Sequence, residues 1–354
     1  MPRDYKKELG ELIGLLEHEG ASDLHLAARR KPFIRVSGGL IPLVKREELT
    51  DDMTFGILGE MISDEKKEVF LKKKELDFSY TTETSMRFRG NAFFQQGLLS
   101  IALRLIPAKI QTLAELNLPP ILETFARRKQ GFFLVVGPVG QGKSTTLAAM
   151  IDLIHKERAE HIMTIEDPIE FMYGPGNSII DQREVGRDTE DFQSALRSMF
   201  REDIDVAMIG EMRGPETMSA AVTAAETGHL VFSTLHTNNA AQTIDRIIDT
   251  FPSDQQNQIR GQLSQSLAGI FSQRLIPRIS GGVIPAYELL VNTNAVANLI
   301  REKRTHEINV VIETGSGEGM ISMDRTLGDL VRRGEIAPEE AEAYSVTEKM
   351  VRSR

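Results

Sequence analysis

Residues 137–146 read Gly-Pro-Val-Gly-Gln-Gly-Lys-Ser-Thr-Thr, a glycine-rich loop that ends in a lysine and a serine. Glycines in such a loop let successive backbone amides turn toward one anion, and phosphate oxygens are the usual occupant. In this pattern the lysine reaches the β- and γ-phosphates and the serine hydroxyl binds Mg²⁺. The predicted nucleotide contacts are Gly137, Val139, Gly140, Gln141, Gly142, Lys143, Ser144 and Thr145, with Lys143 also catalytic and Ser144 also a metal ligand.

The segments on either side of this loop have the character that a phosphate-binding loop requires. Residues 132–136 form an apolar run, long enough for a buried strand, and residues 144–151 have the composition of a helix. A strand before the loop and a helix after it distinguish a P-loop from a glycine turn that merely has a lysine beside it. We therefore expect the chain to bind a nucleoside triphosphate.

Two carboxylates follow later apolar strands. Residues 161–165 run into Glu166, and residues 205–209 are followed shortly by Glu211. Because ligands of open parallel sheets bind outside the carboxyl ends of the strands, both side chains should face the P-loop. A Mg²⁺-ATP site needs one carboxylate near the metal's water shell and one to orient or deprotonate the attacking water. Glu166 and Glu211 are the predicted catalytic and metal-binding pair, and either can take either role.

Histidines flank another apolar segment, residues 230–235. His229 and His236 are seven positions apart, so a straight strand would place them on opposite faces, which argues against a shared metal. His236 follows the carboxyl end of the segment and should face the nucleotide. There it could sense the γ-phosphate or carry a signal to a neighbouring subunit.

Residues 191–201 have an apolar stripe at helical spacing, with Arg197 and Arg201 one turn apart on its flank. These arginines could reach phosphate, or they could pair with acidic side chains. The sequence favours neither interpretation.

Before the P-loop, the pattern predicts a small α/β domain over residues 1–106. Residues 6–18 and most of residues 50–74 have helical patterns, and residues 22–27 alternate as a strand does. A hairpin is expected over residues 33–43. Two further strands, residues 86–94 and 99–106, turn at residues 96–97.

Three arginines fall on the last two of these strands. Arg87 and Arg89 share a face by the period of two, and Arg104 alternates with leucines, so all three could line one side of the sheet. From spacing alone, a solvated surface is the more common explanation. Residues 107–120 contain prolines at both ends and suit an interdomain linker, which leaves residues 121–354 for the nucleotide-binding domain and its C-terminal helices.

Composition limits the remaining possibilities. A chain of 354 residues with 41% hydrophobic residues can form two cores, and a net charge of −9 disfavours nucleic acid as a partner. The absence of cysteine excludes disulfides, tetracysteine zinc sites and a thiol nucleophile, and fits the reducing cytoplasm. We find neither a signal peptide nor an apolar run near the ~18 residues of a membrane span. Any membrane association is expected to go through a partner.

The motifs together resemble those of secretion ATPases. Residues 137–146, 164–170, 209–213 and 227–238 follow the Walker A, Asp box, Walker B and His box of that superfamily, in the same order. Within it the chain is similar to type IV pilus retraction ATPases, because residues 21–26, 87–93 and 298–302 also fit. The resemblance spans nearly the whole length.

This resemblance implies a homo-hexameric ring in which each chain has a PAS-like N-terminal domain and a RecA-like C-terminal domain with a helical tail. ATP and Mg²⁺ would lie between the domains, and Arg87, Arg89 and Arg104 would stabilise phosphate charge. The resemblance also assigns His236 a catalytic role. It places His229, Arg197 and Arg201 among the nucleotide-binding residues.

The implied function is a motor that hydrolyses Mg²⁺-ATP and drives pilus retraction, and with it twitching motility. The implied location is the cytoplasm, at the inner membrane through the pilus machine, with an inner-membrane platform protein as partner and a sister pilus ATPase as a further candidate. Pilus-assembly and type II secretion ATPases usually carry an extra N-terminal domain and a tetracysteine zinc site. Besides these relatives, the alternatives are a DNA motor and a nonhydrolysing regulator of a sister motor.

The chain departs from the family pattern at four places. Val139 and Gln141 stand where threonine and serine are usual, Ile204 replaces a proline, and Gly214 replaces an aspartate. The lysine, serine and two glutamates that carry the chemistry are intact, so we expect hydrolysis to be retained.

Overall fold

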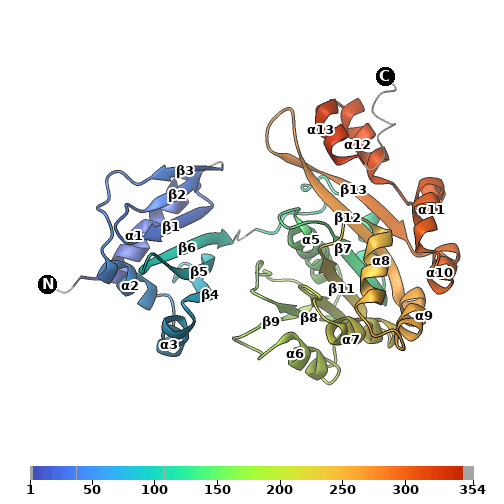
Figure 1. Ribbon diagram of the computed structural model, residues 1–354, viewed down its shortest axis with the longest axis horizontal. Coiled ribbons are helices and arrows are strands. Elements are labelled where there is room, and N and C mark those ends of the chain that lie inside the picture. The colour runs from blue at the N-terminus through green and yellow to red at the C-terminus, as the bar shows by residue number, and fades with distance from the viewer. Residues whose placement is uncertain (1–2, 37, 107–108, 346–354) are drawn as a thin grey trace. The chain divides into compact units, whose positions relative to one another are not determined.

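The computed structural model describes residues 3–36, 38–106 and 109–345 (Figure 1). The chain divides into two compact units, one formed by residues up to Lys109 together with Glu170–Met172, and the other by Ile110–Ile169 and the residues from Tyr173 onward. Residues 107–108, at the start of the predicted linker, lie outside the described residues. Each unit is described by itself below.

The first unit contains a six-stranded sheet in which all neighbouring strands are antiparallel, in the order β3-β2-β1-β6-β5-β4. Its strands are β1 (Asp23–Ala27), β2 (Phe33–Val36), β3 (Gly39–Pro42), β4 (Glu75–Thr81), β5 (Arg87–Gln95) and β6 (Leu98–Ile106). The turn between β5 and β6 has Gln96 and Gly97 at φ values of 50° and 78°, which is the left-handed geometry of a tight hairpin.

Three helices accompany this sheet: α1 (Tyr5–His18), α2 (Asp51–Gly59) and α3 (Asp64–Lys73). Each begins at a residue whose side-chain oxygen accepts a backbone N–H of the first turn, namely Asp4, Thr50 and Ser63. The apolar stripe of α1, with Leu9, Leu12 and Leu16, packs into one core with alternate residues of β1, β5 and β6. The opposite face of the sheet is therefore left for polar side chains.

The second unit contains a seven-stranded sheet in the order β13-β12-β7-β11-β10-β8-β9. All neighbouring strands are parallel except β13, which is antiparallel to β12. The strands are β7 (Gly131–Val136), β8 (His161–Glu166), β9 (Ile179–Glu184), β10 (Val206–Ile209), β11 (Leu230–Leu235), β12 (Leu267–Pro277) and β13 (Val283–Val291). The strands β7, β10 and β11 are buried throughout, as expected of a parallel sheet that is covered on both faces.

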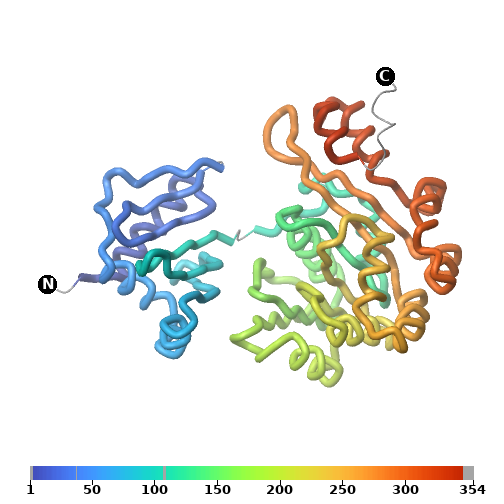
Figure 2. Tube along the Cα trace, in the orientation of Figure 1, coloured from blue at the N-terminus to red at the C-terminus, as the bar shows by residue number. Residues whose placement is uncertain are grey.

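Helices follow most strands of the second unit. The α-helices are α4 (Ile121–Ala126), α5 (Lys143–Glu157), α6 (Phe192–Met199), α7 (Pro215–Glu226), α8 (Ala240–Asp249), α9 (Gln256–Ser266), α10 (Asn294–Arg301), α11 (Ile308–Thr314), α12 (Met323–Arg332) and α13 (Pro338–Tyr344), with short 3₁₀ helices η1 (Thr305–Glu307) and η2 (Gly315–Glu318). Two cores lie on either side of the sheet, and β7 contributes alternate residues to each. A third, smaller core joins β12 and β13 to α12 and α13. The hairpin of β12 and β13, orange in Figure 2, continues past the last residue of β7 that pairs with it.

The predicted α/β fold class is confirmed, and the expected C-terminal helices are present as α12 and α13. The helical stretch expected over residues 50–74 is two helices, because Ser63 caps a new helix after a short break. Four strands, β4, β9, β12 and β13, were not predicted. Within the described ranges, no helix combines the length and the apolar character needed to cross a membrane.

Candidate nucleotide site

The P-loop connects the buried central strand β7 to α5, which begins at Lys143. Gly137, Gly140 and Gly142 have φ values of 148°, 77° and 76°, a region that residues with a Cβ rarely adopt. Nothing lies within 4 Å of the place where a Cβ of Gly140 would stand, so this side of the loop is open. The first turn of α5 has no acidic residue to compensate the positive end of the helix dipole, which favours an anion there.

Lys143 is held inside the loop. Its Nζ donates hydrogen bonds to the carbonyl oxygens of Gly137 and Pro138, both at 2.8 Å, and the residue is only 8% exposed. Carbonyl partners offset the desolvation of the ammonium group without neutralising its charge. Ser144, one residue later, is exposed. The lysine is therefore positioned by the loop itself, and the serine hydroxyl is accessible to a cation.

His236 connects this lysine to Glu211. The histidine Nδ1 lies 3.2 Å from the Lys143 Nζ, and its Nε2 lies 3.2 Å from a Glu211 carboxylate oxygen. Because an ammonium group can only donate, Nδ1 accepts in the first contact, and Nε2–H donates to the carboxylate in the second. The P-loop, β11 and the segment after β10 are thus connected by one line of hydrogen bonds.

The surroundings of Glu211 favour the ionised form of its carboxyl group. Burial raises the pKa of its carboxyl, but the hydrogen bond from Arg213 and the positive charges nearby outweigh burial, so the pKa is lower than usual. An Arg213 guanidinium nitrogen donates to the carboxylate at 3.0 Å. A carboxylate that remains charged can accept a proton from water or bind a hydrated cation.

Glu166 ends β8, beside β10, and lies at the same edge of the sheet. It is buried and accepts hydrogen bonds from the Thr164 hydroxyl at 2.7 Å and from the Gln182 amide at 3.3 Å. A Cβ on Gly210 would lie 3.5 Å from the Glu166 Cα, so the glycine before Glu211 lets the two strand ends approach closely. The two predicted carboxylates are thus brought to one end of neighbouring strands, as the sequence indicated.

A cavity of about 330 Å³ lies beside the start of α5, all of it within the second unit. Gly142, Thr145 and Thr146 form its P-loop side, and Gln273 and Leu275 of β12 form another. The rest of the lining comes from Gln111, residues 115–118, Arg278, Val283 and Pro285. Sequence reasoning missed the contribution of β12, although its apolar run from Leu267 to Phe271 was a strand signal.

Three predicted nucleotide contacts are at the other end of this sheet. His229 precedes β11, and its carbonyl accepts the N–H of Gly131, where β7 begins. Arg197 lies in the last turn of α6, and Arg201 follows that helix and donates to the Arg197 carbonyl at 3.1 Å. Within one chain the structure does not bring these residues to the P-loop, so their assignment stays a prediction.

The arginines of the first unit lie on the sheet face away from its core. Arg89 and Arg104 are directly opposite one another on β5 and β6, and Arg87 lies two residues before Arg89 on the same face. Asp23 is opposite both Arg104 and Arg35, so one row crosses four strands as Arg35, Asp23, Arg104 and Arg89. Sequence reasoning missed Asp23 and Arg35, because only the strand register places them in this row.

Asp23 is the one carboxylate in the row. Its Oδ1 accepts from the Arg104 Nε at 2.9 Å, and its Oδ2 lies 3.8 Å from the Arg35 Nε. Burial would raise the pKa of Asp23, but hydrogen bonds from Ser22 and Arg104 hold it below the usual value. Glu170 lies 3.6 Å from Arg89, so three guanidinium groups face two carboxylates and the strip keeps a small net positive charge that suits an anion.

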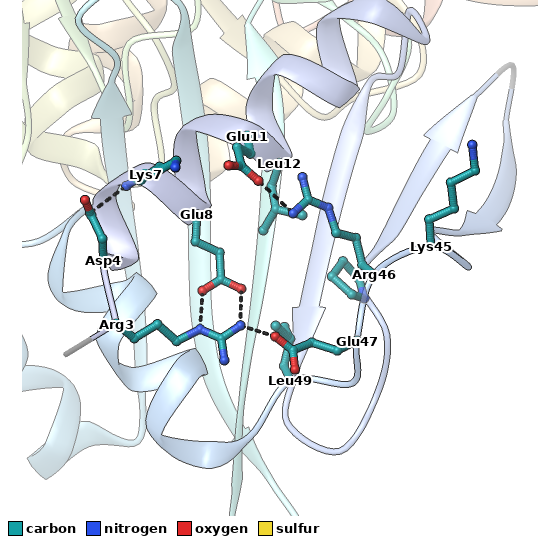
Figure 3. Close-up of a pocket in the computed structure, with 11 residues that line it drawn as sticks. Arg3, Asp4, Lys7, Glu8, Glu11, Leu12, Lys45, Arg46, Glu47 and Leu49 are labelled. Carbon is teal, nitrogen blue, oxygen red and sulfur yellow. Dashed lines mark hydrogen bonds and ion pairs between the residues drawn. The ribbon is translucent and has the colours of Figure 1, made fainter. Parts of the chain in front are cut away.

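A second cavity, of about 480 Å³, lies in the first unit between the start of α1 and residues 45–49 (Figure 3). Its charged side chains pair with one another: Arg3 with Glu8 and Glu47, and Arg46 with Glu11 at 2.8 Å. These pairs are largely solvated. None of the predicted site residues lines this cavity, and we regard its charges as a surface ion-pair cluster.

No group of three or more histidine, aspartate or glutamate side chains in residues 3–36, 38–106 and 109–345 is arranged to hold a metal ion. A Mg²⁺ ion at a triphosphate does not need such a group, because it keeps several waters and uses substrate oxygens with one or two protein ligands. Ser144 and the charged Glu211 offer that donor set.

Comparison with known proteins agrees with this geometry. Residues 62–318 match the model of the family described as "Type II/IV secretion system protein". The type IV pilus retraction ATPase PilT of Pseudomonas aeruginosa is 42% identical over 94% of this chain and 97% of its own length. The type IV pilus ATPase PilU of the same organism is 40% identical over 96% of this chain and 88% of its own.

A crystal structure of the pilus retraction motor PilT with bound ADP has a TM-score of 0.90 against this chain, at 44% identity, covering 96% of this chain and 97% of that one. Both the family model and the near-complete relatives extend over the P-loop, the strand-end carboxylates and His236. The chain is therefore an ATPase that belongs to the type II/IV secretion system protein family.

Proposed function

We propose that this chain is the Mg²⁺-ATP-hydrolysing motor that retracts type IV pili. The line of hydrogen bonds from Lys143 through His236 to Glu211 is the observation that carries the proposal. It joins the group that would bind the γ-phosphate to the group that would orient or deprotonate the attacking water. When Lys143 binds or releases the γ-phosphate, its hydrogen bond to His236 changes, and with it the hydrogen bond from His236 to Glu211. Phosphate binding and water activation would in this way be coupled.

In this proposal the phosphates occupy the open side of the P-loop, and the base and ribose occupy the cavity beside α5. Lys143 binds the terminal phosphates, and Glu211 accepts or orients the proton of the attacking water. Ser144, with Glu211 or Glu166, would hold Mg²⁺, which supplies neutralisation of the phosphate charge. Mg²⁺ suits this donor set because a hydroxyl and a charged carboxylate are oxygen ligands.

Arg87, Arg89 and Arg104 would stabilise phosphate charge from the N-terminal sheet. His229, Arg197 and Arg201 lie at the end of the sheet opposite their own P-loop, so any contact that they make with nucleotide would be with that of a neighbouring chain. In a homo-hexameric ring, neighbouring chains would then complete one another's sites. The ring would act in the cytoplasm on an inner-membrane pilus platform protein, and a sister pilus ATPase is a further candidate partner.

The test is steady-state phosphate release by the purified chain with Mg²⁺-ATP, with the particle mass followed by light scattering. We expect turnover in a particle of six subunits, and its loss in Glu211→Gln and Lys143→Ala. Retained turnover in Lys143→Ala would refute the site assignment. In cells, deletion should leave excess pili that do not retract, whereas a strain without pili would indicate an assembly motor.

The similarity to PilU favours a second candidate function, that of an accessory ATPase beside another retraction motor. A nonhydrolysing regulator is the extreme form of this alternative. Tight ATP binding without turnover, and a deletion strain that still retracts its pili, would support it. Turnover by the chain alone would favour the motor.

A further inference from the structure

The strand β12 extends beyond the end of β7, one of the two strands that it pairs with. Its pairing with β7 ends at Ser272 opposite Val136, the last residue of β7, but β12 continues to Pro277. Buried backbone groups of β12 that face the continuation of β7 therefore need other hydrogen-bond partners. The continuation of β7 is the P-loop.

Gln141, at the tip of the P-loop, supplies these partners. Its side-chain Oε1 accepts the Leu275 N–H at 2.6 Å, so an amide takes the place of a strand carbonyl. In return, the Gln273 Nε2 donates to the Gln141 carbonyl at 2.7 Å. The Gln273 Oε1 accepts from the Thr146 hydroxyl, also at 2.7 Å. We call this set of four residues the Gln141–Gln273 clasp.

The clasp lies directly against the phosphate-binding backbone. A Cβ on Gly137 would stand 2.5 Å from the Gln273 carbonyl oxygen, and one on Gly142 would stand 2.9 Å from the Gln273 Nε2. Gln273 is 2% exposed, so its amide has little access to water as a substitute partner. The clasp thus touches the loop at both ends and at its tip.

Gln141 is also one of the positions where this chain departs from the usual loop, which has serine there. The hydroxyl of a serine is attached to Cβ, whereas the amide oxygen of glutamine is two carbons further out. From this backbone position only the longer side chain reaches the Leu275 N–H. The departure therefore has a structural consequence in this chain.

We propose that Gln141 is a positioning residue that holds the P-loop in its phosphate-binding shape before nucleotide arrives. The inference rests on the proposed function, since it concerns the same site. A loop with three glycines loses much conformational entropy when it is ordered around a ligand. Because the clasp already restrains the free loop, less conformational entropy is lost when nucleotide binds, and the nucleotide binds more tightly.

The test compares Gln141→Ser and Gln141→Met with the wild-type chain. Methionine keeps the length of the side chain but loses the oxygen acceptor. We expect both variants to weaken binding of a fluorescent ADP about fivefold, the effect of one net hydrogen bond. We expect kcat at saturating Mg²⁺-ATP to fall by a smaller factor than kcat/KM, because the contacts among Lys143, His236 and Glu211 are kept. KM for ATP should rise with the ADP dissociation constant.

The hydrogen-exchange rate of the Leu275 amide measures directly whether the clasp is formed. In both variants the Leu275 amide should exchange faster, while amides of the β10–β11 pairing keep their protection. Gln258→Ser is the matched control, because Gln258 is an exposed glutamine of α9 away from the loop. It should leave ADP affinity, kcat and exchange at the wild-type values.

Unchanged ADP affinity, or unchanged exchange at Leu275, would overturn the proposal. Faster exchange throughout the second unit would also overturn it, because Gln141 would then be a general stability residue. If the wild-type chain bound ADP but did not hydrolyse ATP, the proposed motor function would fail while ADP affinity and exchange still decided the role of Gln141.

Discussion

The ionisation of Glu211 depends on a balance between two opposing effects. Burial, the largest cause, raises the pKa of the carboxyl, but the hydrogen bond and charge of Arg213, together with the charges of His236 and Lys143, lower it by more. With Arg213 present, the carboxylate is therefore protonated only below the ordinary glutamate range of about 4.3. Without Arg213, its hydrogen bond and charge no longer oppose burial, so the pKa of Glu211 should rise.

This balance predicts how removal of Arg213 changes the pH dependence of turnover. In Arg213→Ala the acidic limb of the kcat/KM profile should move to higher pH, because protonated Glu211 cannot serve as a base. At neutral pH we expect kcat/KM to fall on the order of tenfold, from the lost charge at the site. The measurement is ATP turnover across the acidic range, with Arg332→Ala as the control. Arg332 is an exposed arginine of α12, which packs near β13, whereas Glu211 follows β10, four strands away in the sheet. An acidic limb at the same pH in Arg213→Ala would show that Glu211 does not control it.

At the scale of elements, local patterns were enough wherever the chemistry lay beside a strong strand. The P-loop follows the buried β7, and Glu166 and Glu211 follow β8 and β10, so the rule that ligands bind at carboxyl ends placed all three correctly. By contrast, β12 was missed. Its second half, from Ser272 to Arg274, is polar because it faces loops, and this interrupts an otherwise apolar run.

Strand register was the other limit of sequence reasoning. The alternation along β5 placed Arg87 and Arg89 on one face, but only the pairing with β6, β1 and β2 shows that Asp23 and Arg35 join their row. A single sequence does not contain that pairing, because residues far apart in the chain become neighbours through non-local hydrogen bonds.

The row of Arg35, Asp23, Arg104 and Arg89 predicts how the stability of the first unit depends on Asp23. Arg89 and Arg104 are like charges placed directly opposite one another, which is destabilising, and Asp23 offsets this repulsion. We expect Asp23→Asn to lower the free energy of unfolding by about 1–2 kcal/mol at neutral pH, a modest figure because Arg104 is 71% exposed and solvent screens it. Sulfate or phosphate should restore part of the loss by binding the arginines.

The pH dependence of this effect follows from the direction of the shift. The folded pKa of Asp23 is depressed, so its contribution is complete above the unfolded aspartate pKa of about 3.9 and is lost as the pH falls through the folded value. The difference in thermal unfolding between the wild type and Asp23→Asn should therefore shrink on acidification. Glu48→Gln, an exposed carboxylate near α2, should show no such difference at any pH. A gap that persisted in strong acid would contradict the ion-pair explanation.

In the whole molecule, the predicted site residues of the second unit fall into two groups at opposite ends of its sheet. Lys143, Glu211 and His236 are at the carboxyl end of the second sheet, and Arg197, Arg201 and His229 are at its other end. One chain cannot bring both groups to one nucleotide without unfolding the sheet between them. If both groups serve hydrolysis, each site must be assembled from two chains.

Mixing two inactive variants tests this directly. Lys143→Ala has a defective P-loop and intact arginines, and the double variant Arg197→Ala, Arg201→Ala has the reverse. If the arginines act across an interface, mixed rings contain some sites with an intact P-loop from one chain and intact arginines from the next, so phosphate release should reappear on mixing. The recovered rate should follow the statistical fraction of such neighbours as the mixing ratio changes. Activity equal to the sum of the separate variants would place the arginines outside the site, and an active double variant would remove them from catalysis altogether.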